Sequence, residues 1–252
     1  MIASALKFAF NTWPTLLLRP KHVWERDGVP LPPTQFRAAG PLFEANQSFL
    51  AYAQADVDLI ARFVNLKRAS VLDFGCGVGR FYFGLRPSNE PRRYLGVDIK
   101  PDVIAWASRE ITEANPRFTF RRLDIHNERY NPSGALDNGA WSSVVTGPFD
   151  VIYSYSVLSH MVEADARCVL DMFSRHLAAA GHLFLTAFVG EQPETIVINP
   201  ADRTTKGPLH IVRYRRDFFV EDVLQQFSIV AEYPEAATDG QTIYVLRKRR
   251  AR

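Results

Sequence analysis

The sequence is short of cysteine and lacks any long apolar run. Its 252 residues contain two cysteines, Cys76 and Cys168, which have neither metal-ligand spacing nor the pattern of a disulfide framework. No apolar run reaches the roughly 18 residues that span a bilayer. The sequence therefore predicts a protein of a reducing compartment, the cytoplasm, without stable membrane insertion.

An excess of charge of one sign is also nearly absent, since the formal net charge is +3. Basic residues gather in the C-terminal tail, residues 247–252, which we interpret as a solvated terminus, with a nucleic-acid or anionic-membrane contact as the alternative. There is no separate basic domain, and no Asn/Asp-Pro-Pro-aromatic signature follows the strand predicted at 149–156. A nucleic-acid substrate is therefore not expected.

The N-terminal stretch MIASALKFAFNTWPTLLLRP partly imitates a signal peptide, but Trp13-Pro14 interrupts it and no clear cleavage site follows. We interpret it as an amphipathic helical extension, with a membrane-surface or dimer contact as the alternative. Prolines and glycines over 26–41 indicate a linker. The predicted division is an extension, residues 1–42, followed by one domain, residues 43–252.

Helix-like and strand-like segments alternate after the linker. Helices are predicted over 43–64, 79–85, 101–114, 163–178 and 217–227, and strands over 69–74, 93–99, 117–125, 149–156, 181–188, 228–234 and 241–249. This alternation predicts an α/β fold with a mainly parallel sheet and helices on both faces. A short turn joins the last two strands, so the final strand is expected to be antiparallel.

A glycine-rich turn follows the first strand. In VLDFGCGVGR (71–80) the strand ends at Asp73 and enters Gly75, Gly77 and Gly79. Glycines permit a tight turn and a close approach of a ligand to the backbone. The Asp73 carboxylate suits a ligand with ammonium and sulfonium groups and disfavours a pyrophosphate. A nicotinamide-dependent enzyme is therefore the less favoured alternative.

Two further aspartates end the next two strands. Asp98 follows Gly79 by nineteen residues, in a position where an acid accepts hydrogen bonds from ribose hydroxyls. Asp124 ends the third strand, where it can meet an adenine amino group. Ile99 and Ile125 come directly after these acids and are expected to line the adenine. The three carboxylates at one sheet edge thus predict a nucleoside-binding site.

The segments LDFGCGVGR, YLGVDI, RRLDI and FDVIYSYSVLSHM resemble, in this order, the motifs of class I S-adenosylmethionine (SAM)-dependent methyltransferases. The resemblance covers about residues 40–248, and its finer similarity is to small-molecule and glycan methyltransferases. It implies a seven-stranded Rossmann-like sheet with the last strand reversed. It also implies that Asp73 and the glycine loop hold the methionine part of SAM, Asp98 the ribose, and Asp124 with Ile125 the adenine.

Two segments depart from the family pattern. LAAAGHL (177–183) stands where many relatives have a Pro-Gly-Gly turn, and residues 131–148 form a long insert. The first departure is structural, whereas the second affects the shape of the pocket.

The fourth strand is expected to end beside the methyl group. His160 follows it and has an ordinary pKa suited to a general base, the alternative being a histidine that caps the next helix or hydrogen-bonds to backbone. Tyr153 is assigned to the cofactor site and Tyr155 to the acceptor site. We expect only one of these tyrosines to face the ligand, on the premise that they alternate between faces.

Residues 207–218 form a second candidate acceptor region. His210, Arg213 and Tyr214 are candidate contacts, and Arg213 with its arginine neighbours 215 and 216 could hold an anionic group, the alternative being a solvated loop. No spacing indicates a divalent metal, so none is assigned, although Asp and His side chains near the strand ends leave one possible.

Three other histidines receive lesser roles. His126 is expected near the adenine, and His176 and His182 are expected to be structural.

The predicted function is SAM-dependent O-methylation of a hydroxylated small molecule, such as a sugar or secondary metabolite, with His160 as the base. Residues 1–42 and 191–216 are expected to form a lid that excludes water. The alternatives are N-methylation of a small amine and a SAM-binding protein without turnover. The oligomeric state is not predicted.

Overall fold

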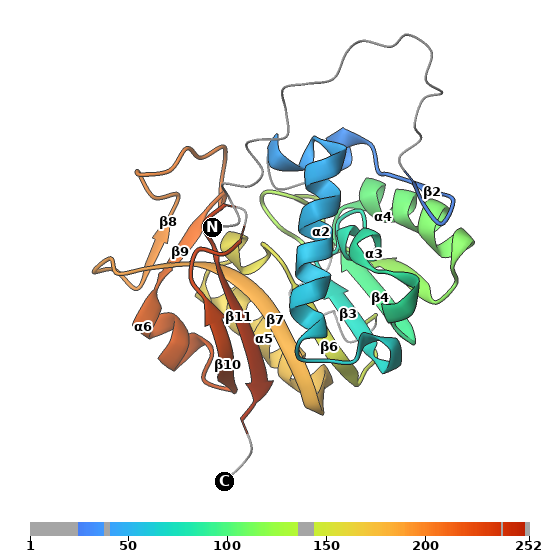
Figure 1. Ribbon diagram of the computed structural model, residues 1–252. Coiled ribbons are helices and arrows are strands. Elements are labelled where there is room, and N and C mark those ends of the chain that lie inside the picture. Colours follow the sequence, from blue (N-terminus) through green and yellow to red (C-terminus); the bar gives the residue numbers. More distant parts are fainter. Residues whose placement is uncertain (1–24, 38–40, 136–143, 238, 250–252) are drawn as a thin grey trace, which may run out of the picture.

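A mainly parallel sheet with helices on both faces forms the body of the protein (Figure 1). The computed structural model describes residues 25–37, 41–135, 144–237 and 239–249. In spatial order the strands are β10 (Phe227–Tyr233), β11 (Thr242–Lys248), β7 (Leu177–Gly190), β6 (Phe149–Ser154), β3 (Ser70–Phe74), β4 (Arg93–Asp98) and β5 (Phe118–Arg122). Strand β11 runs antiparallel to both β7 and β10. This confirms the predicted fold class and the reversed last strand.

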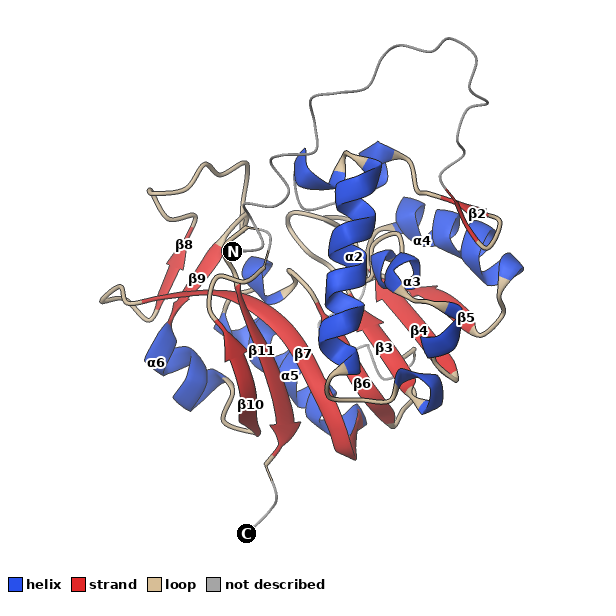
Figure 2. Cartoon of the chain, viewed as in Figure 1, coloured by secondary structure: helices blue, strands red, loops and turns tan. Residues whose placement is uncertain are grey.

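The two faces of the sheet are covered by different helices (Figure 2). Helices α2 (Asn46–Ala61), α3 (Arg80–Gly84) and α4 (Pro101–Ala107) cover one face, and α5 (Glu163–His176) and α6 (Arg216–Phe218) the other. Side chains of a strand alternate between faces, so Val71 packs with α2 and Leu72 with α5. In α2 the buried positions 49, 53, 57 and 60 recur at the spacing of one helix face.

Two of these helices continue in a wider coil. Residues Ser108–Thr112 extend α4 and Phe219–Val223 extend α6 as π-helical turns. The helix predicted over 101–114 is therefore confirmed. The one predicted over 217–227 begins one residue earlier and gives way to a turn after Val223.

The segment LAAAGHL (177–183) belongs to strand β7 rather than to a turn. Helix α5 ends at His176 and β7 begins at Leu177, whereas a helix to residue 178 and a strand from 181 were predicted. Phe149 pairs with Leu177 while Val151 pairs with His182, so the register shifts between them. The extra residues are accommodated as an irregularity in the strand, and the sheet continues without a break.

Two short hairpins were not predicted. Strands β1 (Glu25–Arg26) and β2 (Val29–Pro30) pair within the expected linker, and β8 (Ile196–Ile198) pairs with β9 (Val212–Arg215) in the expected lid. Strand β9 also pairs in parallel with the end of β7, which fixes the second hairpin to the main sheet. The helix expected in residues 1–24 and the last residues of the basic tail lie outside the described residues. Among the described helices, none is long and apolar enough to cross a membrane.

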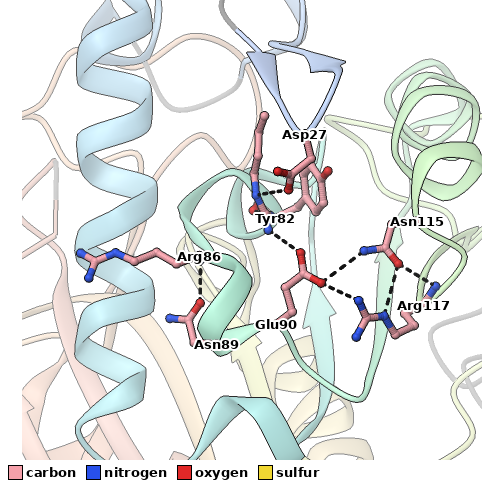
Figure 3. A network of polar contacts seen from close by, with 8 residues as sticks. Asp27, Tyr82, Arg86, Asn89, Glu90, Asn115 and Arg117 are labelled. Carbon is pink, nitrogen blue, oxygen red and sulfur yellow. Dashed lines mark hydrogen bonds and ion pairs between the residues drawn. The ribbon is translucent and has the colours of Figure 1, made fainter.

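A network around Glu90 attaches the first hairpin to the body (Figure 3). Arg26 and Arg117 both reach the Glu90 carboxylate at 2.7 Å. The Arg26 guanidinium also donates to the carbonyl of Tyr82 and lies 4.1 Å from the centre of its ring. The side chains of Glu90 and Arg26 are 11% and 10% exposed, so this pair is largely dehydrated, whereas Arg117 at 55% remains in contact with water.

We expect Glu90→Ala to lower the free energy of unfolding by about 2 kcal/mol, because it leaves two guanidiniums without their shared acceptor. Urea denaturation measures this change. The control is Glu113→Ala, which removes an exposed carboxylate from the same part of the chain. Equal stability of the two variants would show that the network does not hold the hairpin.

Candidate functional site

A cavity of about 700 Å³ lies at the carboxyl ends of the parallel strands. Its wall contains the loops that follow β3, β4, β5 and β6, the end of β7, and parts of both segments expected to form a lid. The carboxyl edge is where open α/β sheets bind ligands, because the strand ends and the helix starts leave a crevice there.

The glycine loop takes backbone conformations that favour glycine. Gly75, Gly77 and Gly79 have φ values of 77°, 52° and 75°. Gly75 and Gly77 line the cavity. Gly79 instead stands at the start of α3, where an added Cβ would come within 3.0 Å of Ile111 and Phe120. The third glycine therefore serves packing of the loop on the sheet.

Asp73 lies at the floor of the cavity as a buried carboxylate. Tyr94 donates its hydroxyl to Asp73 Oδ2 at 2.5 Å. Burial raises the pKa of Asp73 to about 7, since the charged form is deprived of water. A cationic group in the cavity would favour the ionised carboxylate.

Asp98 joins the glycine loop to the end of β4. Its two oxygens accept hydrogen bonds from Gly77 N at 2.8 Å and from Lys100 N at 2.9 Å. Burial raises the pKa of Asp98 as well. Each oxygen retains lone-pair capacity for a further donor, so the carboxylate can receive a pair of ligand hydroxyls.

The predicted adenine residues divide into two groups. Ile99, Ile125 and His126 line the cavity. Asp124 does not; it accepts hydrogen bonds from Arg122 at 2.6 Å and from Asn131 at 3.2 Å. Its carboxylate thus secures the loop after β5.

Tyr153 and Tyr155 both line the cavity, so the expectation that only one faces the ligand is wrong. Residues two apart in a strand share a face, and these two ring centres lie 6.3 Å apart. Arg80 connects them: it donates to the Tyr153 hydroxyl and lies 4.4 Å from the ring centre of Tyr155. Asp56 of α2 pairs with Arg80 at 2.5 Å and accepts the Tyr153 hydroxyl at 2.6 Å. This cluster fastens α2 to the glycine loop.

His160 lines the cavity with a defined tautomer. Its Nδ1 is 3.1 Å from the carbonyl of Leu209, which can only accept, so Nδ1 carries the proton. Its Nε2 is 3.2 Å from the Tyr130 hydroxyl, which therefore donates to it. Burial first, and then the charge of Arg129, lower the pKa of His160 to about 4. The imidazole is neutral at pH 7.

Only one of the three candidate residues of the second acceptor region, His210, lies in the cavity wall. The His210 ring lines the cavity and is parallel to that of His160, with 6.5 Å between centres. Tyr214 is fully buried and donates its hydroxyl to the carbonyl of Met161. Arg213 pairs with Asp202. Neither of these two side chains is part of the cavity wall.

The other arginines and histidines singled out in the sequence lie away from the cavity. Arg215 and Arg216 pair with Asp217 and Glu232. His182 accepts a hydrogen bond from Arg247 across β7 and β11. His176, at the end of α5, is not part of the cavity wall either.

Polar residues of the cavity wall that sequence reasoning missed include Arg80, Arg129, Tyr130 and Arg203. Arg80 directly follows the glycine loop, and its place in the sequence could have indicated it. The others lie in long loops without a periodic pattern. Within the described ranges, no three His, Cys, Asp or Glu side chains gather as a metal site.

A family model described as a methyltransferase domain matches residues 72–183. The fold is similar to that of the PH0226 protein from Pyrococcus horikoshii OT3, with a TM-score of 0.57 and 18% identity over 81% of this chain and 92% of that one. It is also similar to the glycopeptide N-methyltransferase MtfA complexed with SAM, with a TM-score of 0.54 and 14% identity over 79% of this chain and 94% of that one. A third similar fold is that of magnesium protoporphyrin IX methyltransferase (ChlM) from Synechocystis PCC 6803 with bound SAM. Its TM-score is 0.53 and its identity 16%, over 85% of this chain and 88% of that one.

The fold and the glycine-lined cavity thus define a Rossmann-like protein with a ligand site at the carboxyl edge of its sheet. The matched methyltransferase domain contains the glycine loop, Asp73, Asp98 and His160. The fold around it is similar to those of methyltransferases whose structures were solved with SAM.

Proposed function

We propose that the protein transfers the methyl group of SAM to a hydroxyl of a small molecule bound beside His160. The observation that carries this proposal is the pair of Tyr130 and the neutral His160, joined at 3.2 Å in the cavity wall. A hydroxyl acceptor must lose its proton as the new bond forms, and this pair offers a route for that proton.

The carboxylates at the strand ends account for the binding of SAM. When bound, SAM supplies a methyl group on a cationic sulfur, together with an ammonium group. Asp73 faces that positive charge, and Asp98 accepts the ribose hydroxyls while holding the glycine loop. Ile99 and Ile125 contact the adenine from the cavity wall. Holding donor and acceptor in line is then the main task of the site.

The proton of the acceptor moves towards His160 Nε2. The Tyr130 hydroxyl donates to this nitrogen, so its oxygen is free to accept the hydrogen bond of the acceptor. As methyl transfer proceeds, Tyr130 takes that proton and passes its own to Nε2. The Leu209 carbonyl keeps the Nδ1–H in place and stabilises the imidazolium that forms.

Two segments shield the site from water. Phe36 and Arg37 from the N-terminal extension line the cavity, and so do Arg203, His210 and Ile211 from the predicted lid. Arg37 is buried and donates to three backbone carbonyls, which fixes this part of the extension. We therefore keep residues 1–42 as a covering extension and 43–252 as the catalytic domain. Cys76 and Cys168 form no disulfide within the described residues, which is compatible with the proposed cytoplasmic location.

The second candidate is N-methylation of a small amine. The observation in its favour is the pKa of His160 of about 4, which makes this histidine a weak base. A neutral amine is already nucleophilic and needs no proton removed before attack. The glycopeptide N-methyltransferase MtfA shows that a protein of similar fold can have an N-methyl activity.

The test is a transfer assay with methyl-labelled SAM and a panel of hydroxylated sugars, phenols and their amino counterparts, read out as S-adenosylhomocysteine (SAH) release. We expect turnover with hydroxylated members. Turnover with amines alone would favour the second candidate. SAH binding without turnover of any member would indicate a protein that binds SAM for another purpose.

The pKa of Asp73 predicts a pH dependence of SAH binding. Only the ionised carboxylate attracts the ammonium group, and its ionised fraction falls as pH drops through about 7. We expect the Kd for SAH to rise about tenfold from pH 8 to pH 6. Asp73→Asn should remove this slope. Calorimetric titration at both pH values measures it, and an unchanged slope in the variant would assign it to another group.

A further inference from the structure

Charged residues of both signs line the cavity. Asp73 and Asp98 come from β3 and β4 and suit the cationic SAM. Arg129, in the loop after β5, and Arg203, in the predicted lid, also join the wall. Asp165 and Asp239 also reach the wall, and Gln241 donates to both oxygens of Asp239. Among the ion pairs of the described residues, however, none joins either guanidinium to a carboxylate.

Arg129 lies next to the proposed proton acceptors. Its guanidinium donates to the carbonyl of Lys206 and lies 5.2 Å from the ring centre of Tyr130. Its Nε is buried with no hydrogen-bond acceptor in the described part of the chain. Its charge lowers the pKa of both His160 and His210, so it acts on both rings.

Arg203 and His210 add two more donors. Arg203 donates to the backbone carbonyl of Asp239 and lies 5.2 Å from the ring centre of Phe188. Lys206 N donates to His210 Nδ1 at 2.8 Å, so the proton of the neutral ring is on Nε2. By contrast, Arg80 in the same wall is paired with Asp56. Unpaired guanidiniums in a cavity wall favour an anionic ligand.

We propose that the methyl acceptor is a hydroxylated carboxylic acid, whose carboxylate binds Arg129 and His210 below the lid while its hydroxyl meets Tyr130. This inference rests on the proposed function. The carboxylate offsets the charge of Arg129, which makes His160 a better proton acceptor.

The experiment uses the full chain saturated with SAH and two matched pairs of probes. These are 4-hydroxybenzoate with 4-hydroxybenzamide, and glucuronate with glucuronamide. We expect at least one acid to bind about tenfold more tightly than its amide, since a charge-assisted contact is lost with the carboxylate. Arg129→Gln should remove this preference. Arg121→Gln, which removes an exposed charge from β5 outside the cavity wall, should retain it.

SAH affinity is measured in the same samples and reports on folding. If the wild-type protein does not bind SAH, the proposed function itself is contradicted. With SAH bound, three results would overturn the inference alone: equal binding of acids and amides, no binding of either acid, or an unchanged acid preference in Arg129→Gln. His210→Leu provides a second variant, which removes the other proposed donor and is expected to weaken the preference if Arg129→Gln fails to fold.

Discussion

Replacing Asp98 by alanine is expected to weaken SAH binding by about 100-fold or more. The carboxylate is proposed to accept two ribose hydroxyls, and hydrogen bonds to a charged group contribute about 1.5–3 kcal/mol each. The same oxygens hold Gly77 N and Lys100 N, so the variant also frees the glycine loop from the end of β4. Both losses act in the same direction.

The matched control is Asp102→Ala. This carboxylate lies four residues further on, in the first turn of α4, is exposed, and contacts only Val103 N in the hydrogen bonds of the described residues. Calorimetry should give an SAH affinity within about twofold of the wild type for this control. Comparable affinities for both variants would remove Asp98 from the binding site.

Replacing His160 by glutamine is expected to lower kcat by about 10²–10⁴-fold for a hydroxyl acceptor, the range typical of general acid–base catalysis. Glutamine retains polarity and approximate size but does not take up a proton. KM for SAM should change little, because the hydrogen bonds and ring contacts of His160 go to Tyr130, Leu209, His210 and Val157 and not to the glycine loop. Tyr130→Phe should lower kcat in the same sense, since it interrupts the proposed route to Nε2.

The pH profile distinguishes this role from a structural one. With a pKa of about 4, His160 is already neutral at pH 6, so its titration adds no loss of activity between pH 8 and pH 6. If kcat at saturating SAM fell with decreasing pH around the ordinary pKa of histidine, a base other than His160 would be responsible. An unchanged kcat in both variants, with a hydroxyl acceptor, would mean that the pair only shapes the cavity.

Much of the fold followed from local patterns. Apolar runs ending in Asp73 and Asp98 marked buried strands, and the short turn before β11 required an antiparallel last strand. Both features depend only on residues that are close together in the chain, so they can be predicted from the sequence. The boundary between α5 and β7 did not follow, because a strand irregularity at 177–181 replaces the expected turn.

The acceptor side was far less predictable, because it depends on contacts between distant segments. Tyr130 meets His160 across 30 residues, and Arg129 meets Lys206 across 77. Arg213 carried the right chemistry, but Asp202 neutralises it outside the cavity. Asp124 stood at the expected strand end, yet Arg122 and Asn131 hold it. The residue type at a motif position does not reveal which neighbouring side chain will form a hydrogen bond or ion pair with it.

The central claim is that the glycine-lined cavity with Asp73 and Asp98 binds SAM rather than a dinucleotide. Calorimetric titration of the wild-type protein with SAH and, separately, with NAD tests it most directly. The structure predicts micromolar binding of SAH and no binding of NAD, because the buried Asp73 carboxylate attracts an ammonium and repels a pyrophosphate. Binding of NAD with no binding of SAH would contradict the account.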